Sequence, residues 1–232
     1  MLEVGGLCAW YGAAQILFDV SLNVGPGEVV ALMGRNGAGK STTMKALMAL
    51  VPRRSGQAQF LGQDLMRRKT YQIARLGLGW VPEDRRIFTE LTVLENLEVA
   101  RRPARQGRPW TPERLFALFP NLAEMRDRPG GRMSGGEQQM LTVARTLMGN
   151  PLMVLLDEPS EGVAPVLVER MAQTIIELKA EGLPILLSEQ NLHFAELVSD
   201  RVYLLEKGHI AWSGSMGELS SSVEVQRQLL TV

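Results

Sequence analysis

The chain has 232 residues, 45% of them hydrophobic, and its 25 basic and 25 acidic side chains cancel to zero formal net charge. This length suffices for one domain with a full core, and the balanced charge provides no global field that favours nucleic acid. The sequence contains neither an apolar run of about 18 residues nor a secretory signal. The single Cys8 excludes an intramolecular disulfide. We therefore expect one domain that neither spans a membrane nor is secreted.

The first part of the chain predicts an antiparallel sheet. Residues 2–10 and 16–24 alternate like half-buried strands, and a Gly-Pro-Gly turn follows them. Tyr11 is expected in the loop between the two strands. The apolar run at residues 27–33 then predicts a buried strand that leads into a glycine-rich segment.

That segment, GRNGAGKST at residues 34–42, matches the pattern G-x-x-x-x-G-K-[ST] and is followed by a predicted helix over residues 42–50. Backbone N–H groups of such a loop hold phosphates at a helix N-terminus. Lys40 would reach the β- and γ-phosphates, and the hydroxyl of Ser41 would bind Mg²⁺. The residues predicted to contact nucleotide in this loop are Gly34, Arg35, Asn36, Gly37, Ala38, Gly39, Lys40, Ser41 and Thr42.

From about residue 86 to residue 149 the pattern becomes helical. Thr92 with Glu95 forms a capping box, and Thr111 before Pro112 is a typical N-cap followed by proline at the first helical position. The stretch at residues 101–109 is rich in arginine and proline, which favours a solvated loop over a functional basic patch.

The sequence SGGEQQ begins the last helix of this region, expected to end near residue 148. Ser134 and Glu137 form a second capping box, so capping alone is one interpretation of the motif. However, Gly135 and Gly136 in a first turn cost up to about 1 kcal/mol each relative to alanine. We therefore favour an anion site at this helix N-terminus whose ligand comes from outside the chain.

Two acids end the next predicted strand. Residues 152–156 form an apolar run, and Asp157 and Glu158 follow it, where open α/β sheets place their ligands. Asp157 would hold Mg²⁺ through water. Glu158 would orient or deprotonate the attacking water, since phosphoryl transfer is catalysed mainly by positioning and charge neutralisation. Beyond it we expect helices at 165–181, from 191, and at 223–230, and strands at 184–188, 201–206 and 209–212.

Together the three motifs resemble the ATP-binding cassette (ABC) ATPases, in the order and spacing of that family's Walker A, signature and Walker B motifs. The resemblance implies an α/β fold: a P-loop NTPase (RecA-like) core, an N-terminal antiparallel β subdomain, and an inserted α-helical subdomain over residues 86–149 of the single 1–232 domain. It also implies that two cassettes close head to tail, so that the segment from Ser134 to Glu137 faces the γ-phosphate held by the other copy. Tyr11 is the residue that would stack on adenine.

The sequence departs from the common ABC pattern at two positions. Glu83 stands where most cassettes have glutamine, which touches Mg²⁺ or the attacking water, and Gln190 stands where most have a histidine that contacts the γ-phosphate. Glutamate can still ligate a metal, and an amide can still orient a phosphate. His193, three residues further on, is expected on a helix surface. Residues 160–162 after the catalytic carboxylate would form a loop that crosses the dimer interface, although a simple helix-capping region is the alternative.

These departures, with EPSEGVAP and EQNLHFA, closely resemble one of the two ATPases of importers for branched-chain and other hydrophobic amino acids, a group that includes amide and urea importers. The resemblance implies membrane permease subunits as partners, a second ABC ATPase that is the same or a related chain, and an external solute-binding protein acting indirectly. It places the chain on the cytoplasmic face of the inner membrane, with ATP and Mg²⁺ as cofactors. The alternatives are a soluble ABC ATPase outside transport and a nucleotide-binding module without turnover.

Overall fold

The strands of the central sheet run β10-β9-β3-β8-β7-β6 across the molecule. The computed structural model describes residues 1–105 and 107–229. β6, β7, β8, β3 and β9 are parallel, and β10 pairs antiparallel with β9 at one edge. The sheet consists of β10 (His209–Ser215), β9 (Arg201–Glu206), β3 (Val29–Met33), β8 (Ile185–Glu189), β7 (Met153–Asp157) and β6 (Leu78–Val81).

Both faces of this sheet are buried, which explains why its central strands are apolar throughout. Successive residues of a strand point to opposite faces, so Leu155 and Leu186 pack with α1 (Lys40–Leu47) and the small sheet. On the other face, Leu156 and Leu187 pack with α6 (Gly135–Met148) and α7 (Pro165–Ala180). Loops at the carboxyl ends of β3, β7 and β8 are thereby carried on a rigid support.

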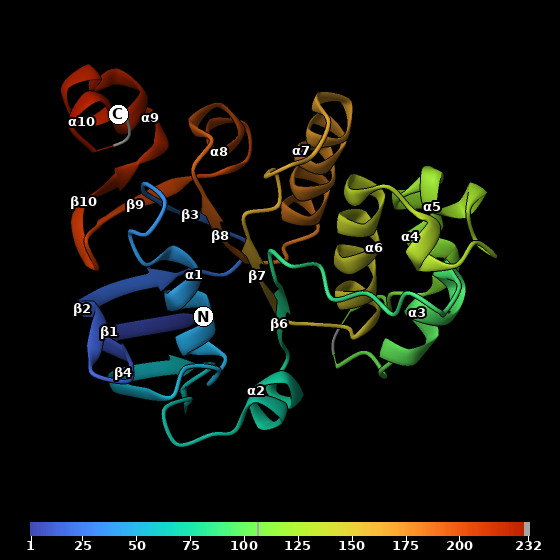
Figure 1. The fold of residues 1–232 in the computed structure, drawn as a ribbon, viewed down its shortest axis with the longest axis horizontal. Coiled ribbons are helices and arrows are strands. Elements are labelled where there is room, and N and C mark those ends of the chain that lie inside the picture. The colour runs from blue at the N-terminus through green and yellow to red at the C-terminus, as the bar shows by residue number, and fades with distance from the viewer. Residues whose placement is uncertain (106, 230–232) are drawn as a thin grey trace.

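A second, four-stranded antiparallel sheet lies beside α1 in the order β2-β1-β4-β5 (Figure 1). Its strands are β1 (Leu2–Tyr11), β2 (Ala14–Val24), β4 (Arg53–Phe60) and β5 (Gln63–Asp64). The first two agree with the predicted strands to within two residues. The prediction that Tyr11 lies in the loop between these strands is wrong. It is the last residue of β1 and pairs with Ala14. Cross-strand pairing therefore extends almost to the hairpin turn, and it holds the Tyr11 backbone in place.

Helices α3 to α6 lie together at the end of the molecule away from the small sheet (Figure 1). The first three are α3 (Val93–Ala100), α4 (Pro112–Leu118) and α5 (Pro120–Glu124), whereas α2 (Thr70–Leu76) is separate and precedes β6. The predicted caps are present, because Thr92 Oγ1 accepts from Glu95 N at 3.2 Å and Thr111 Oγ1 accepts from Arg114 N at 3.3 Å. α6 packs against both α3 and α7, and so links these helices to the central sheet.

The C-terminal elements are α8 (Leu192–Val198), α9 (Met216–Ser221) and α10 (Val223–Leu229). The short helix α9 was not predicted. A capping box of Ser215 and Glu218 starts it, and Met216 and Leu219 bury its inner face. The predicted end of the last helix at Leu230 lies outside the described residues. Over the described ranges, none of the helices has the length and apolar character needed to cross a membrane.

Candidate active site

A pocket of about 450 Å³ opens at the carboxyl end of the central sheet. Nine of the predicted site residues line it: Tyr11, Asn36, Gly37, Gly39, Lys40, Ser41, Thr42, Glu83 and Glu158. The structure thus brings the glycine-rich loop, the aromatic end of β1 and the acid after β7 to one place. Ile16 and Glu161 also line the pocket. Glu161 adds a carboxyl group to the pocket that the sequence analysis assigned only to a loop across the dimer interface.

The glycine-rich loop needs glycine because it passes against other backbone and side chains. A Cβ at Gly34 would lie 2.2 Å from the carbonyl oxygen of Leu205, and one at Gly39, where φ is 113°, would lie 2.8 Å from Leu17 Cδ2. Neither contact can be relieved by a side-chain rotation of the new residue. Ala38 fixes the same loop through its backbone, because its oxygen accepts from Gly208 N at 2.9 Å.

Lys40 is buried and makes three polar contacts inside the site. Its Nζ donates to Gly34 O at 2.7 Å and to Arg35 O at 3.2 Å, and lies 3.1 Å from Glu158 Oε1. The ammonium is therefore removed from water, and its charge is balanced by Glu158 and by two carbonyl oxygens of the loop. It lies beside the pocket. A phosphate group entering the pocket would meet a cation whose position is already set.

Asp157, at the end of β7, has one satisfied and one unsatisfied carboxylate oxygen. Oδ1 accepts from Ser188 Oγ at 2.6 Å, whereas Oδ2 is buried and has no hydrogen-bond partner in the described part of the chain. Burial raises the pKa of this carboxyl, and the hydroxyl groups of Ser188 and Ser41 oppose the rise. A buried oxygen without a partner, beside a serine hydroxyl, suits a hard cation with oxygen ligands. The donor set therefore fits Mg²⁺.

Glu158 and Glu161 form a carboxyl pair in the pocket. Burial raises the pKa of Glu158, but its hydrogen bond with Glu161 and the charge of Lys40 prevail, and the net pKa is lowered. The same hydrogen bond raises the pKa of Glu161 to about 7. The shared proton thus belongs to Glu161, and Glu158 is the ionised partner. Glu158 also has a left-handed backbone, with φ of 46°, a conformation that is uncommon for a residue with a Cβ.

The loop after β7 and the start of α8 are held by Glu189, a buried residue that was not predicted as a site residue. Its Oε1 accepts from Ser160 N at 3.1 Å, and its Oε2 accepts from Gln190 N at 2.9 Å and Asn191 N at 3.0 Å. Gln190 itself is exposed, and the pocket lining does not include it. His193 is exposed on α8, as expected.

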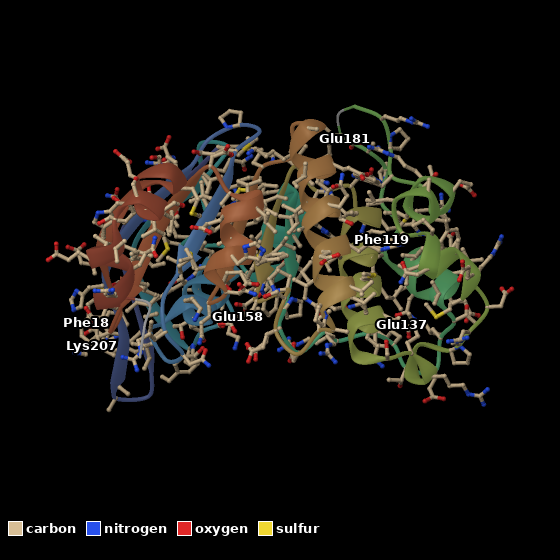
Figure 2. The ribbon with its side chains drawn as sticks, turned by 90° about the horizontal axis from the view of Figure 1, so that it is seen from above. Phe18, Phe119, Glu137, Glu158, Glu181 and Lys207 are labelled. Atoms are coloured by element: carbon tan, nitrogen blue, oxygen red, sulfur yellow. The ribbon has the colours of Figure 1, made fainter. Side chains whose placement is uncertain are left out.

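The predicted signature residues lie apart from this pocket. Figure 2 shows Glu137 and Glu158 separated along the same side of the molecule, with Glu181 on the opposite side. The capping box is present, since Ser134 N donates to Glu137 Oε2 at 2.7 Å. A methyl group on Gly135 would lie 2.5 Å from Arg85 Nη1, and one on Gly136 would lie 2.4 Å from Leu167 Cδ1. Packing against Leu167 and Val163 therefore supplies one reason for Gly136, whereas the atoms near Gly135 are the far end of an arginine side chain that could move aside.

Comparison with known proteins assigns the family. Residues 17–161 match the family model described as ABC transporter. The chain is 38% identical to the high-affinity branched-chain amino acid transport ATP-binding protein BraG of Pseudomonas aeruginosa, over 97% of each chain. It is 33% identical to the lipopolysaccharide export system ATP-binding protein LptB of Haemophilus influenzae, over 99% of this chain and 97% of the other.

Among solved structures, a nucleotide-free ATP-binding cassette from an ABC transporter matches with a TM-score of 0.82 and 27% identity, over 97% of this chain and 96% of that one. The chain belongs to the ABC transporter family of ATPases. It is an ATP-binding subunit that hydrolyses ATP, and its fold is the predicted P-loop NTPase fold.

The residues that the sequence analysis missed hold other residues of the site in position through hydrogen bonds. Ser188 was expected only as the end of a predicted strand, yet its Oγ donates to Asp157 Oδ1 at 2.6 Å and accepts from Glu158 N at 3.2 Å. The available signal was a serine and a glutamate closing an apolar strand, an unusual end for a buried parallel strand.

Proposed function

We propose that this chain is the ATP-hydrolysing subunit of an importer for branched-chain or other hydrophobic amino acids, or for related amides. The observation that supports this proposal most is the likeness to BraG, which spans nearly the whole chain at 38% identity. The set of residues that departs from the common ABC pattern, Glu83 with Gln190 and the EPSEG segment, points to the same group. The chain would act from the membrane surface, as a peripheral subunit on the permease.

In this proposal Lys40 and the loop N–H groups bind the triphosphate, and Tyr11 stacks on adenine. Ser41 and Asp157 would hold Mg²⁺, and Glu83 at the pocket wall could serve as a further oxygen ligand. Bound Mg²⁺ would neutralise charge on the β- and γ-phosphates. Glu158 accepts a proton from the attacking water, and its lowered pKa keeps it ionised for this role. Gln190 would have to move to reach the γ-phosphate, because the pocket wall does not include it.

The site of one chain is incomplete without a second copy or a related cassette. Four predicted signature residues begin a helix whose N-terminus is exposed at Ser134, yet they stand outside the pocket: Ser134, Gly135, Gly136 and Glu137. A second chain placed head to tail would bring these residues to the γ-phosphate. ATP would then close the dimer, hydrolysis would reopen it, and this two-state motion would be passed to the permease.

A groove of about 760 Å³ between α2, β6 and the C-terminal ends of α3 and α6 is where we place the permease contact. The arginines that line it are Arg75, Arg102, Arg105 and Arg145, and the described lining has no acidic side chain. Trp80 Nε1 and Arg145 Nη1 are buried there without hydrogen-bond partners in the described part of the chain. These features suit an acidic segment of a partner that also supplies acceptors. Lipopolysaccharide export is the second candidate, because LptB is similar over the whole chain.

The first test uses Glu158→Gln, which keeps the volume and removes the carboxylate. Hydrolysis should slow by orders of magnitude while ATP still binds, so size-exclusion chromatography should show a dimer with MgATP and mainly monomer with MgADP. Hydrolysis near the parent rate in the complete complex would show that Glu158 is not the catalytic carboxylate and would direct attention to Glu83.

The second test addresses the solute. Cells lacking the gene should lose uptake of labelled leucine or of an amide, and the parent gene should restore uptake where Glu158→Gln does not. Unchanged uptake with loss of outer-membrane lipopolysaccharide would support the export alternative. Unchanged uptake and lipopolysaccharide, with no permease co-purifying from membranes, would favour a soluble ATPase outside transport.

A further inference from the structure

Arg85, in the loop after β6, is a partly buried arginine whose guanidinium has no hydrogen bond or ion pair to any described residue. The guanidinium lies against the start of α6, since a methyl group on Gly135 would be 2.5 Å from Nη1, 3.1 Å from Cζ and 3.2 Å from Nη2. It also approaches the loop after β7, where a methyl group on Gly162 would be 3.8 Å from Nη2. Arg85 thus lies where three segments of the site converge.

The backbone holds Arg85 in this position. Its φ is 62°, in the left-handed region that a residue with a Cβ adopts at a cost. Arg85 N donates to Pro82 O at 3.2 Å, and Arg85 O accepts from Thr142 Oγ1 on α6 at 2.8 Å. The loop is therefore fastened to α6 on one side, and the side chain is directed across the first turn of that helix.

A stabilising role within the single chain does not account for this arrangement. A helix N-terminus carries partial positive charge, so an unpaired cation beside it is unfavourable by up to about 1 kcal/mol. The neighbouring Arg86 shows the ordinary alternative, because its Nε binds both carboxylate oxygens of Asp84 at 2.8 Å. Arg85 has no such acid, and an anion is the group that would satisfy both the guanidinium and the helix.

The charge in the pocket calls for an additional cation. Among the described lining residues, three carry carboxyl groups, namely Glu83, Glu158 and Glu161, and Lys40 is the only cation. Triphosphate adds negative charge that a single Mg²⁺ would offset only in part, and Gln190 cannot become cationic as histidine can. A guanidinium can bind two phosphate oxygens at once, which makes arginine suited to this role.

We infer that Arg85 binds the γ-phosphate of the ATP held by a second copy of this chain. This inference rests on the proposed head-to-tail dimer, in which the start of α6 faces the phosphates of the other copy. Arg85 would enter the composite site together with Gly135 and contribute a positive charge that is absent from the pocket of the single chain. ADP lacks the γ-phosphate, so the contact would distinguish the two nucleotides.

The experiment measures the dimer dissociation constant in the Glu158→Gln background by sedimentation velocity with MgATP. Arg85→Gln should weaken this dimer by roughly tenfold or more, and Arg85→Lys by less, because a lost hydrogen bond to a charged group has about this effect. The matched control is Arg86→Gln, which removes the same charge from the adjacent position and should leave the constant unchanged. Binding of labelled ADP by the monomer should be equal in all variants.

Each other outcome overturns the inference. If the Glu158→Gln protein itself forms no dimer with ATP, the proposed dimer fails and the role of Arg85 fails with it. If that dimer forms and Arg85→Gln leaves it unchanged, only the role of Arg85 is wrong. A similar loss of ADP binding by the monomer, or an equal effect of Arg86→Gln, would show that Arg85 acts within its own chain or through local structure.

Discussion

At the scale of single residues, the active site is prepared for phosphate by Lys40. Its ammonium contacts Gly34 O, Arg35 O and Glu158 Oε1, so its position is set by acceptors that are themselves buried or fixed in the loop. Preorganised charge of this kind stabilises a transition state without reorganisation at the moment of reaction.

Lys40→Ala should therefore lower the hydrolysis rate by roughly 100-fold or more, because developing negative charge on the phosphate loses its cation. Phosphate release at saturating MgATP measures this rate. Lys207→Ala is the matched control, since Lys207 is exposed on the turn between β9 and β10, and it should retain the parent rate. Turnover near the parent rate in Lys40→Ala would contradict the assignment of the glycine-rich loop.

The carboxyl pair predicts a pH dependence of nucleotide affinity. The hydrogen bond with Glu158 raises the pKa of Glu161 to about 7, so Glu161 is neutral below that pH and adds a negative charge to the pocket above it. ATP affinity of the parent should fall relative to Glu161→Gln as the pH rises from about 6 to about 8, by roughly threefold to tenfold. Comparing the two proteins at each pH cancels the titration of ATP itself. Parallel pH profiles would show that Glu161 does not titrate in this range.

At the scale of elements, α3 depends on a buried polar residue that its apolar pattern does not reveal. Asn96 is fully buried, and its Oδ1 accepts from Phe88 N at 2.9 Å while its Nδ2 donates to Phe88 O at 2.9 Å. The Asn96 side chain thus pairs with the backbone N–H and carbonyl of Phe88, as a neighbouring β-strand would. It fastens the loop that precedes α3 to the helix.

Asn96→Leu should destabilise the protein by about 1–3 kcal/mol, because Phe88 N loses its acceptor and the carbonyl oxygens of Phe88, Leu91 and Thr92 lose the buried amide as a donor. Chemical denaturation monitored by circular dichroism measures the free energy of unfolding. The exposed Glu98→Gln on the same helix should change it by less than about 0.5 kcal/mol. An equally small effect for Asn96→Leu would mean that water reaches the Phe88 groups.

At the scale of the whole molecule, the pocket and the basic groove are joined by one short segment. Strand β6 lines the groove with Leu78, Gly79 and Trp80, and the chain then passes directly to Glu83 in the pocket wall. A partner that moves in the groove would therefore move a residue of the nucleotide site. This connection provides a physical route by which closure and transport could be coupled.

Arg75→Glu should reduce co-purification with the permease, since it places an acid among the arginines of the groove, facing an acidic partner segment. Hydrolysis by the isolated subunit should stay at the parent rate, because Arg75 does not line the nucleotide pocket. Retained permease binding would place the docking surface elsewhere. Arg67→Glu, at a residue that is 93% exposed and does not line the groove, serves as the control.

The sequence by itself determined the residues that act through local backbone and through fixed spacing. The glycine-rich loop, the caps at Thr92, Thr111 and Ser134, and the two acids at the end of β7 could be predicted, because each depends on neighbours within a few positions. These motifs also identified the family, and so the fold. The number of cassettes in the working assembly and the roles of the single site residues stay predictions.

The tertiary structure decided which distant residues meet. Ser188 binds Asp157 across 31 positions, Glu189 holds Ser160 across 29, and Arg85 reaches the first turn of α6 from another loop. No periodicity or spacing signals such contacts, because they arise where parallel strands place their carboxyl ends side by side. The surroundings of Gly135 show most directly how the information from the sequence differs from that of the fold. Sequence alone indicated an anion from outside the chain, whereas the fold adds a guanidinium from within it, which would have to shift to accommodate a Cβ at Gly135.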